Sequence, residues 1–81
     1  MPKVFEWRGY RFHFFSFEGS PREPIHIHAA KAGAEAKFWL YPAVRLADSR
    51  NLSPLEIRRL EKVIEEHRQE ITEAWNEFFA R

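Results

Sequence analysis

Two histidines, His26 and His28, stand close together in a segment that we expect to form a β-strand. Residues two apart on a strand point to the same face, about 6.6–7 Å apart along the chain. Imidazole is a common metal ligand, and its pKa lies near neutral pH. The pair therefore predicts either a metal site or an acid–base site on one face of a sheet.

A metal site at this pair needs a third ligand. His13 or Glu35 would serve if the fold brought either side chain near, with Zn–N bonds of about 2.0–2.1 Å. The structural alternative is that the two histidines pack against Trp39 at a surface or sheet edge and bond to water or backbone. Without a third ligand the metal site is weak, so we expect no bound cofactor.

An acid–base site would use the same pair differently. A base, an acid and a cation are the minimum set for cleaving an RNA phosphodiester. His26, His28 and Lys37 supply these groups, and Arg11 or His13 are further candidates for phosphate contact. The enzymatic hypothesis is therefore a small ribonuclease-type toxin. Whether the chain is an enzyme stays open, and we favour a protein without catalytic activity.

The first element that must position these residues is a β-hairpin over residues 4–7 and 10–15. Gly9 follows Arg8 in a two-residue loop, where glycine supplies the positive φ that tight hairpin turns need. This turn pairs Trp7 with Tyr10 and Phe5 with Phe12. Alternation then gathers the aromatic side chains on one face, which is more consistent with a core than with a base-stacking platform.

A second hairpin follows a predicted loop at residues 18–23. Strands at 25–30 and 34–41, with a turn at residues 32 and 33, place His28 opposite Lys37 and His26 opposite Trp39. Residues 44–47 form a short fifth strand in this scheme, and residues 48–51 form a turn. The two histidines then share a face, opposite the face that carries Ile27.

The last element is a long helix. Ser53 is its N-cap, Pro54 occupies the first helical position and Glu56 completes a capping box. Apolar residues recur every three or four positions, and neither Gly nor Pro interrupts residues 55–81. His67 lies within the apolar stripe, where we expect a core or boundary histidine with one nitrogen bonded.

The helix is long for so small a protein. Residues 54–79 would span about 39 Å, whereas a compact chain of this size has a diameter of about 30 Å. The helix must bend, or its last turns must project beyond the sheet. Projecting side chains of Trp75, Phe78 and Phe79 would form a surface for a partner or for self-association.

Composition and charge limit the remaining possibilities. The 81 residues make one domain (1–81), with a sheet half (1–52) and a helix half (53–81). The chain has no Cys, no secretion signal and no apolar run near the roughly 18 residues of a membrane span, so we expect a cytoplasmic protein without membrane contact. The net charge of +1 argues against an obligate nucleic-acid binder. Exposure of Trp39 beside Lys37 would favour nucleic acid only if the histidine face is open.

Several stretches together resemble one family of small prokaryotic proteins, catalogued as domain of unknown function 4160. The similar stretches are residues 9–12, 16–18, 24–28, 36–40 and 75–79, in that order along the chain. The His-x-His feature of the family is retained at His26 and His28. The resemblance implies a single domain and a partner protein, because members are often encoded beside another small protein in an arrangement that has suggested toxin–antitoxin pairing. It implies no reaction and no catalytic residues.

We therefore expect an α+β fold, an antiparallel sheet of four or five strands followed by one long C-terminal amphipathic helix packed on one face. The leading hypothesis is an interaction module that binds a small co-encoded protein or a second copy of itself. Its binding surface would be either the histidine face, with Lys37 and Trp39, or the helix end.

Overall fold

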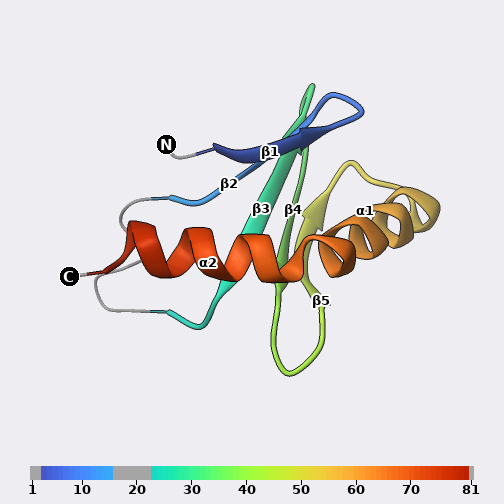
Figure 1. The fold of residues 1–81 in the computed structure, drawn as a ribbon. Helices are drawn as coiled ribbons and strands as arrows, with labels where there is room; N and C mark the ends of the chain where they lie inside the picture. Colours follow the sequence, from blue (N-terminus) through green and yellow to red (C-terminus); the bar gives the residue numbers. More distant parts are fainter. Residues whose placement is uncertain (1–2, 16–22, 81) are drawn as a thin grey trace.

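A computed structural model of the protein describes residues 3–15 and 23–80. Five strands are followed by two helices (Figure 1). The elements are β1 (Lys3–Trp7), β2 (Tyr10–His13), β3 (His26–Lys31), β4 (Ala34–Trp39), β5 (Arg45–Arg50), α1 (Pro54–Glu66) and α2 (Arg68–Phe78). The strands form one antiparallel sheet in the order β1-β2-β3-β4-β5, so the α+β class is confirmed and the sheet has five strands.

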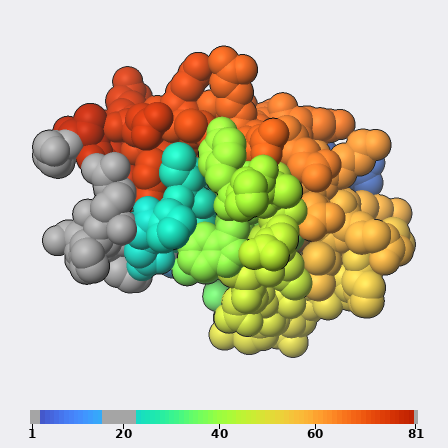
Figure 2. Space-filling view, turned by 90° about the horizontal axis from the view of Figure 1, so that it is seen from below, coloured from blue at the N-terminus to red at the C-terminus, as the bar shows by residue number. Residues whose placement is uncertain are grey.

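The molecule has two layers. Both helices lie across the same face of the sheet (Figure 1). Viewed from below, β3 to β5 line one side and the helices the other, with β1 almost hidden (Figure 2). Neither helix in the described part of the chain has the length and apolar character needed to span a membrane.

The two hairpins confirm the predicted turns and registers. Arg8 and Gly9 have φ of 48° and 84°, as a tight hairpin turn requires. Trp7 pairs with Tyr10, and Phe5 pairs with Phe12. The second hairpin has the same kind of turn at residues 32 and 33, with positive φ at both. The loop predicted at residues 18–23 lies outside the described residues except for Glu23.

The fifth strand is longer than predicted. The predicted turn at residues 48–51 is wrong, because β5 continues to Arg50 and only Asn51 has positive φ. Asp48 and Ser49 favour turns when considered alone. Here they pair with Lys37 and Ala36, after a register shift that accommodates Ala47. Pairing with the neighbouring strand has overridden the local preference.

The helix begins as predicted but is not continuous. The Glu56 backbone N–H donates to the Ser53 hydroxyl at 3.1 Å, and Pro54 is the first residue of α1. The prediction of one long helix is wrong, because His67 (φ −106°, ψ 13°) separates α1 from α2. The ring of His67 stacks on Phe5 with centroids 4.1 Å apart, a contact that only the folded chain provides. His67 also contacts a Glu70 oxygen through Nδ1 at 2.8 Å, which confirms the predicted boundary histidine.

The core lies between the sheet and the two helices. It contains Tyr10, Phe12, Phe14, Ile27, Ala29, Ala36, Phe38, Leu40, Val44, Leu60, Val63, Ile64, Ile71, Trp75 and Phe79. The second alternative for the helix, projecting final turns, is wrong. Trp75 and Phe79 are 1% and 6% exposed, and Phe78 is half-buried. Interrupting the helix at His67 brings these aromatic side chains onto the sheet, where Trp75 packs against Phe14 with centroids 5.2 Å apart.

Candidate interaction surface on the open face of the sheet

The face of the sheet that turns away from the helices carries the residues predicted to do chemistry. No helix or strand of the described chain covers this face (Figure 1). Because side chains alternate along each strand, the register places them in rows that cross all five strands. One row is Lys3, His13, His28, Lys37 and Asp48, and the next is Glu6, Arg11, Ala30, Glu35 and Arg50. We call these two rows the open face.

Aromatic rings meet at the centre of the open face. The rings of His13 and His28 are roughly parallel, with centroids 5.6 Å apart. Phe15 packs edge-on against both, at 5.0 Å from His13 and 4.5 Å from His28. His13 is only 6% exposed, whereas His28 is half-buried. Of the histidines predicted on this face, His28 is therefore the most exposed.

His26 does not lie where the chemical hypotheses need it. Its ring is 0% exposed and packs edge-on against Trp39, His28 and, from α2, Trp75. Its Nδ1 lies 2.9 Å from the Pro24 carbonyl oxygen. The expectation that both imidazoles look outward is wrong for His26, because the end of the sheet is closed by the C-terminal part of α2.

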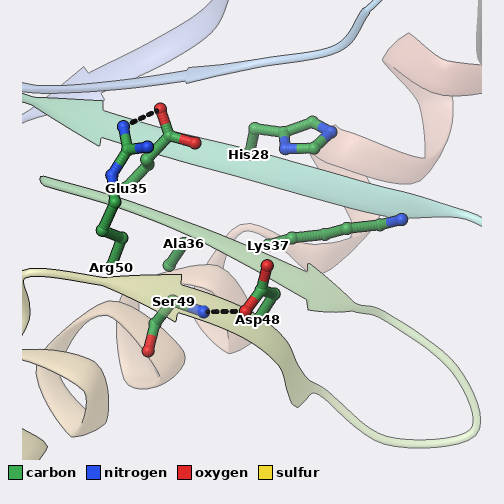
Figure 3. A pocket seen from close by; sticks show the side chains of 7 residues that line it. All are labelled: His28, Glu35, Ala36, Lys37, Asp48, Ser49 and Arg50. Carbon is green, nitrogen blue, oxygen red and sulfur yellow. Dashed lines mark hydrogen bonds and ion pairs between the residues drawn. The ribbon is translucent and has the colours of Figure 1, made fainter.

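Lys37 lies beside His28 on the neighbouring strand. Its Nζ is 4.5 Å from the centroid of the Trp39 ring and 3.5 Å from a Glu23 carboxylate oxygen. The side chain keeps 25% of its surface exposed. In Figure 3 the side chains of His28 and Lys37 extend in the same direction, along the sheet. A cation and a half-buried imidazole are thus brought together, as predicted from the register.

A shallow pocket adjoins this pair. It has a volume of about 320 Å³ and is lined by His28, Glu35, Ala36, Lys37, Asp48, Ser49 and Arg50. Glu35 and Arg50 form an ion pair at 3.1 Å on one side of the pocket (Figure 3). The Asp48 carboxylate accepts a hydrogen bond from the Ser49 backbone N–H at 2.9 Å. The pocket is polar and carries both signs of charge.

The other end of the open face is polar as well. Lys3, Glu6, Arg11 and His13 line a second depression of about 230 Å³. Lys3 binds Glu6 at 2.7 Å, and this contact is the main reason that the pKa of Glu6 lies below its usual value. Arg11 is exposed and pairs with Glu6 in the register. Both ends of the open face therefore carry cations and carboxylates.

The described side chains do not fit the metal hypothesis. No group of three or more His, Asp or Glu residues in the described ranges is arranged to hold a metal ion. Of the two proposed third ligands, Glu35 is paired with Arg50, and the His13 ring stacks on His28. The ring of His26 lies edge-on to His28 with centroids 5.1 Å apart, but it is fully buried and its Nδ1 faces the Pro24 carbonyl oxygen.

The open face contains residues that the sequence did not predict. Asp48 and Arg50 belong to it only because β5 continues past residue 47. Alternation was the signal that would have found them, since Asp48 and Arg50 lie two apart in the same strand. The proposed helix-end surface contributes nothing here, because Trp75 and Phe79 belong to the core.

Comparison with known proteins gives one result. The family described as "Domain of unknown function (DUF4160)" matches residues 9–76. No curated protein and no solved structure matched the chain. The matched residues include β2 to β5 and nearly all of the helices, and hence most of the open face.

Proposed function

The chain belongs to the DUF4160 family, and we propose that it is a small interaction module that binds a partner protein through the open face of its sheet. One observation carries the proposal. The helices cover only one face, and the other presents half-buried rings surrounded by charged side chains. Protein interfaces combine an aromatic centre with a polar rim in this way.

The charges of the open face favour a protein over a nucleic acid. Lys3, Lys37 and Arg50 each lie within 4 Å of a carboxylate. A phosphate backbone is bound by cations that are free to replace its counterions. Binding nucleic acid here would bring phosphates against those carboxylates, whereas a protein surface can meet both signs of charge.

The ribonuclease and metal hypotheses are supported less well. Both need two accessible imidazoles side by side, and His26 is fully buried. His28 and Lys37 remain accessible, but they supply one titratable ring and one cation. The geometry is sufficient for a contact surface, and the described residues of the open face offer no second accessible imidazole for the ribonuclease hypothesis.

The partner that we propose is the small protein encoded by the neighbouring gene. The basis is the resemblance described above, in which family members often have such a neighbour. A toxin–antitoxin-like pair is the finer form of this proposal. In that form, induced expression of one component alone would arrest growth, and expression of both together would restore it.

The proposal is tested by co-expressing the chain with the neighbouring gene product and measuring the Kd of the complex. We expect a stable complex that Lys37→Glu and Arg11→Glu each weaken about tenfold or more, since each replaces a cation of the open face with a carboxylate, opposite Asp48 or Glu6 respectively. Arg58→Glu is the matched control, because Arg58 is an exposed residue of α1 outside that face. Binding that withstands both open-face variants would refute this surface.

A further inference from the structure

The outer edge of β1 is a second exposed feature, which adjoins the open face at Lys3. β1 ends the sheet, so no strand in the described ranges pairs with this edge. Val4, Phe5 and Trp7 are half-buried there and pack against the core. α2 lies near the start of the strand and α1 near its end (Figure 1). This seam between β1 and the helices is therefore partly apolar along its length.

The seam is positively charged at the end of β1. A pocket of about 320 Å³ lies there between the hairpin turn and α1. It is lined by Trp7, Arg8, Arg59, Lys62, Val63 and Glu66. The guanidinium carbon of Arg8 is 5.2 Å from the centroid of the Trp7 ring, and Arg59 contacts Glu56 at 3.3 Å. Among the lining residues the three cations, Arg8, Arg59 and Lys62, outnumber the one carboxylate, Glu66, so this end is basic.

The seam is negatively charged at the start of β1. A pocket of about 440 Å³ lies between β1 and α2, lined by Lys3, Val4, Phe14, Glu70, Ala74, Glu77 and Phe78. Lys3, the cation among these residues, is bound to Glu6 at 2.7 Å. Glu70 and Glu77, both from α2, therefore lie beside the apolar side chains that line this pocket. The two ends of the seam therefore have opposite charge.

We infer that β1 and its flanking helices form an interface with a second copy of this chain, related by a two-fold axis close to Phe5. A two-fold axis perpendicular to the strand reverses its direction in the second copy. The basic pocket of each copy then faces the acidic pocket of the other, and both contacts occur twice. Phe5 meets its equivalent near the axis, and Val4 of each copy lies towards Trp7 of the other, so that apolar surface leaves water at the centre.

A second copy is favoured because each chain carries both the basic pocket and the acidic pocket that the interface needs. A partner with one sign of charge would match one end of the seam and be repelled at the other. The opposite edge of the sheet, at β5, is unsuited to pairing, so association through β1 stops at two copies. All six residues of β5 are exposed, and its charged side chains and register shift are features that discourage strand pairing.

Analytical ultracentrifugation of the full chain tests the inference. We expect a dimer that dissociates on dilution and at high salt, because screening weakens contacts between exposed charges. Lys62→Glu and Glu77→Lys should each raise the dissociation constant about tenfold, since each places like charges opposite one another at both contacts.

Mixing the two variants gives the decisive measurement. In a heterodimer of Lys62→Glu with Glu77→Lys, the new Glu faces the new Lys and the native Glu77 faces the native Lys62. We expect the equimolar mixture to dimerise about as strongly as the native protein, although each variant alone does not. The matched controls are Arg58→Glu and Glu65→Lys, two exposed α1 residues that line neither pocket.

Three results would overturn the inference. The first is a native protein that stays monomeric at concentrations of about 1 mM, where even a Kd of about 1 mM would be visible. The second is a native dimer that both variants leave intact. The third is a mixture that fails to recover while each variant keeps its circular dichroism spectrum. None of these results bears on the open face, which contains neither Lys62 nor Glu77.

Discussion

At the scale of single residues, the hydroxyl of Tyr10 links the sheet to the start of α1. It donates to a Glu56 carboxylate oxygen at 2.6 Å, and Tyr10 is 3% exposed. Burial, followed by the bond to Glu56, raises the pKa of Tyr10 to about 12. The same bond is the main reason that the pKa of Glu56 lies below its usual value. Glu56 thus serves the N-cap through its backbone N–H and, through its carboxylate, makes a tertiary contact that the sequence did not predict.

The pKa of Tyr10 predicts how stability depends on alkaline pH. A pKa raised in the folded state favours the protonated phenol, so its contribution is complete below about pH 10 and disappears as pH rises through about 12. We expect Tyr10→Phe to lower the free energy of unfolding at pH 7. We also expect it to reduce the loss of stability between pH 10 and 12, as measured by urea unfolding.

Tyr41→Phe is the control for this experiment. Tyr41 is 49% exposed, and among the described residues its hydroxyl bonds to the Thr72 hydroxyl, at 2.8 Å, rather than to a carboxylate. The alkaline decline should persist in Tyr41→Phe. An unchanged decline in Tyr10→Phe would contradict the role assigned to the Tyr10 phenol.

At the scale of elements, the helix start depends on local chemistry and the helix interruption depends on tertiary contacts. Ser53 and Pro54 fix where α1 begins, with the Ser53 hydroxyl bonded to the Glu56 N–H. His67 interrupts the helix although no Gly or Pro is near it in the sequence. Its stacking on Phe5, itself stacked on Phe12 at 4.3 Å, accompanies the interruption.

The N-cap supplies a prediction for α1. Ser53→Ala removes the acceptor of the Glu56 N–H and should lower the free energy of unfolding by about 1 kcal/mol. Thermal unfolding followed by circular dichroism measures the loss. Ser49→Ala, at an exposed position of β5, should change stability by less than about 0.5 kcal/mol. Equal effects of the two variants would contradict the capping role.

At the scale of the whole molecule, Trp75 joins the two layers of the fold. Its ring packs against Phe14 of the chain after β2, His26 of β3 and Phe79 after α2, with centroids 5.2, 5.1 and 4.4 Å away. The burial of His26 and the closure of this end of the sheet both follow from its position. Trp75 therefore decides which histidines remain accessible on the open face.

Replacing Trp75 tests this role. Trp75→Ala should cost about 3–5 kcal/mol, a large part of the roughly 5–15 kcal/mol that stabilises a small domain. Denaturant unfolding measures the cost. Trp39→Ala should cost less, because Trp39 is half-buried and lies outside the buried core. A greater loss in Trp39→Ala than in Trp75→Ala would contradict the central position assigned to Trp75.

Sequence alone determined the features that local chemistry controls. The positive φ of Gly9 and Gly33 set both hairpin turns, and alternation then set the registers, including His28 beside Lys37. Ser53 and Pro54 set the start of the helix. These features depend on neighbours in the chain, so reading the residues was sufficient.

Tertiary structure decided the features that depend on contacts between distant segments. His26 and His28 lie two residues apart on β3, where alternation assigns both to the same face. Trp75 nevertheless covers His26 and leaves His28 accessible. β5 extends through Asp48 and Ser49 because β4 pairs with them, and the helix is interrupted where His67 meets Phe5. The preference of a single residue for one secondary structure amounts to a few tenths of a kcal/mol. Burying an aromatic ring, or completing the backbone hydrogen bonds between two strands, contributes more. The packed arrangement therefore overrides the local pattern wherever the two compete.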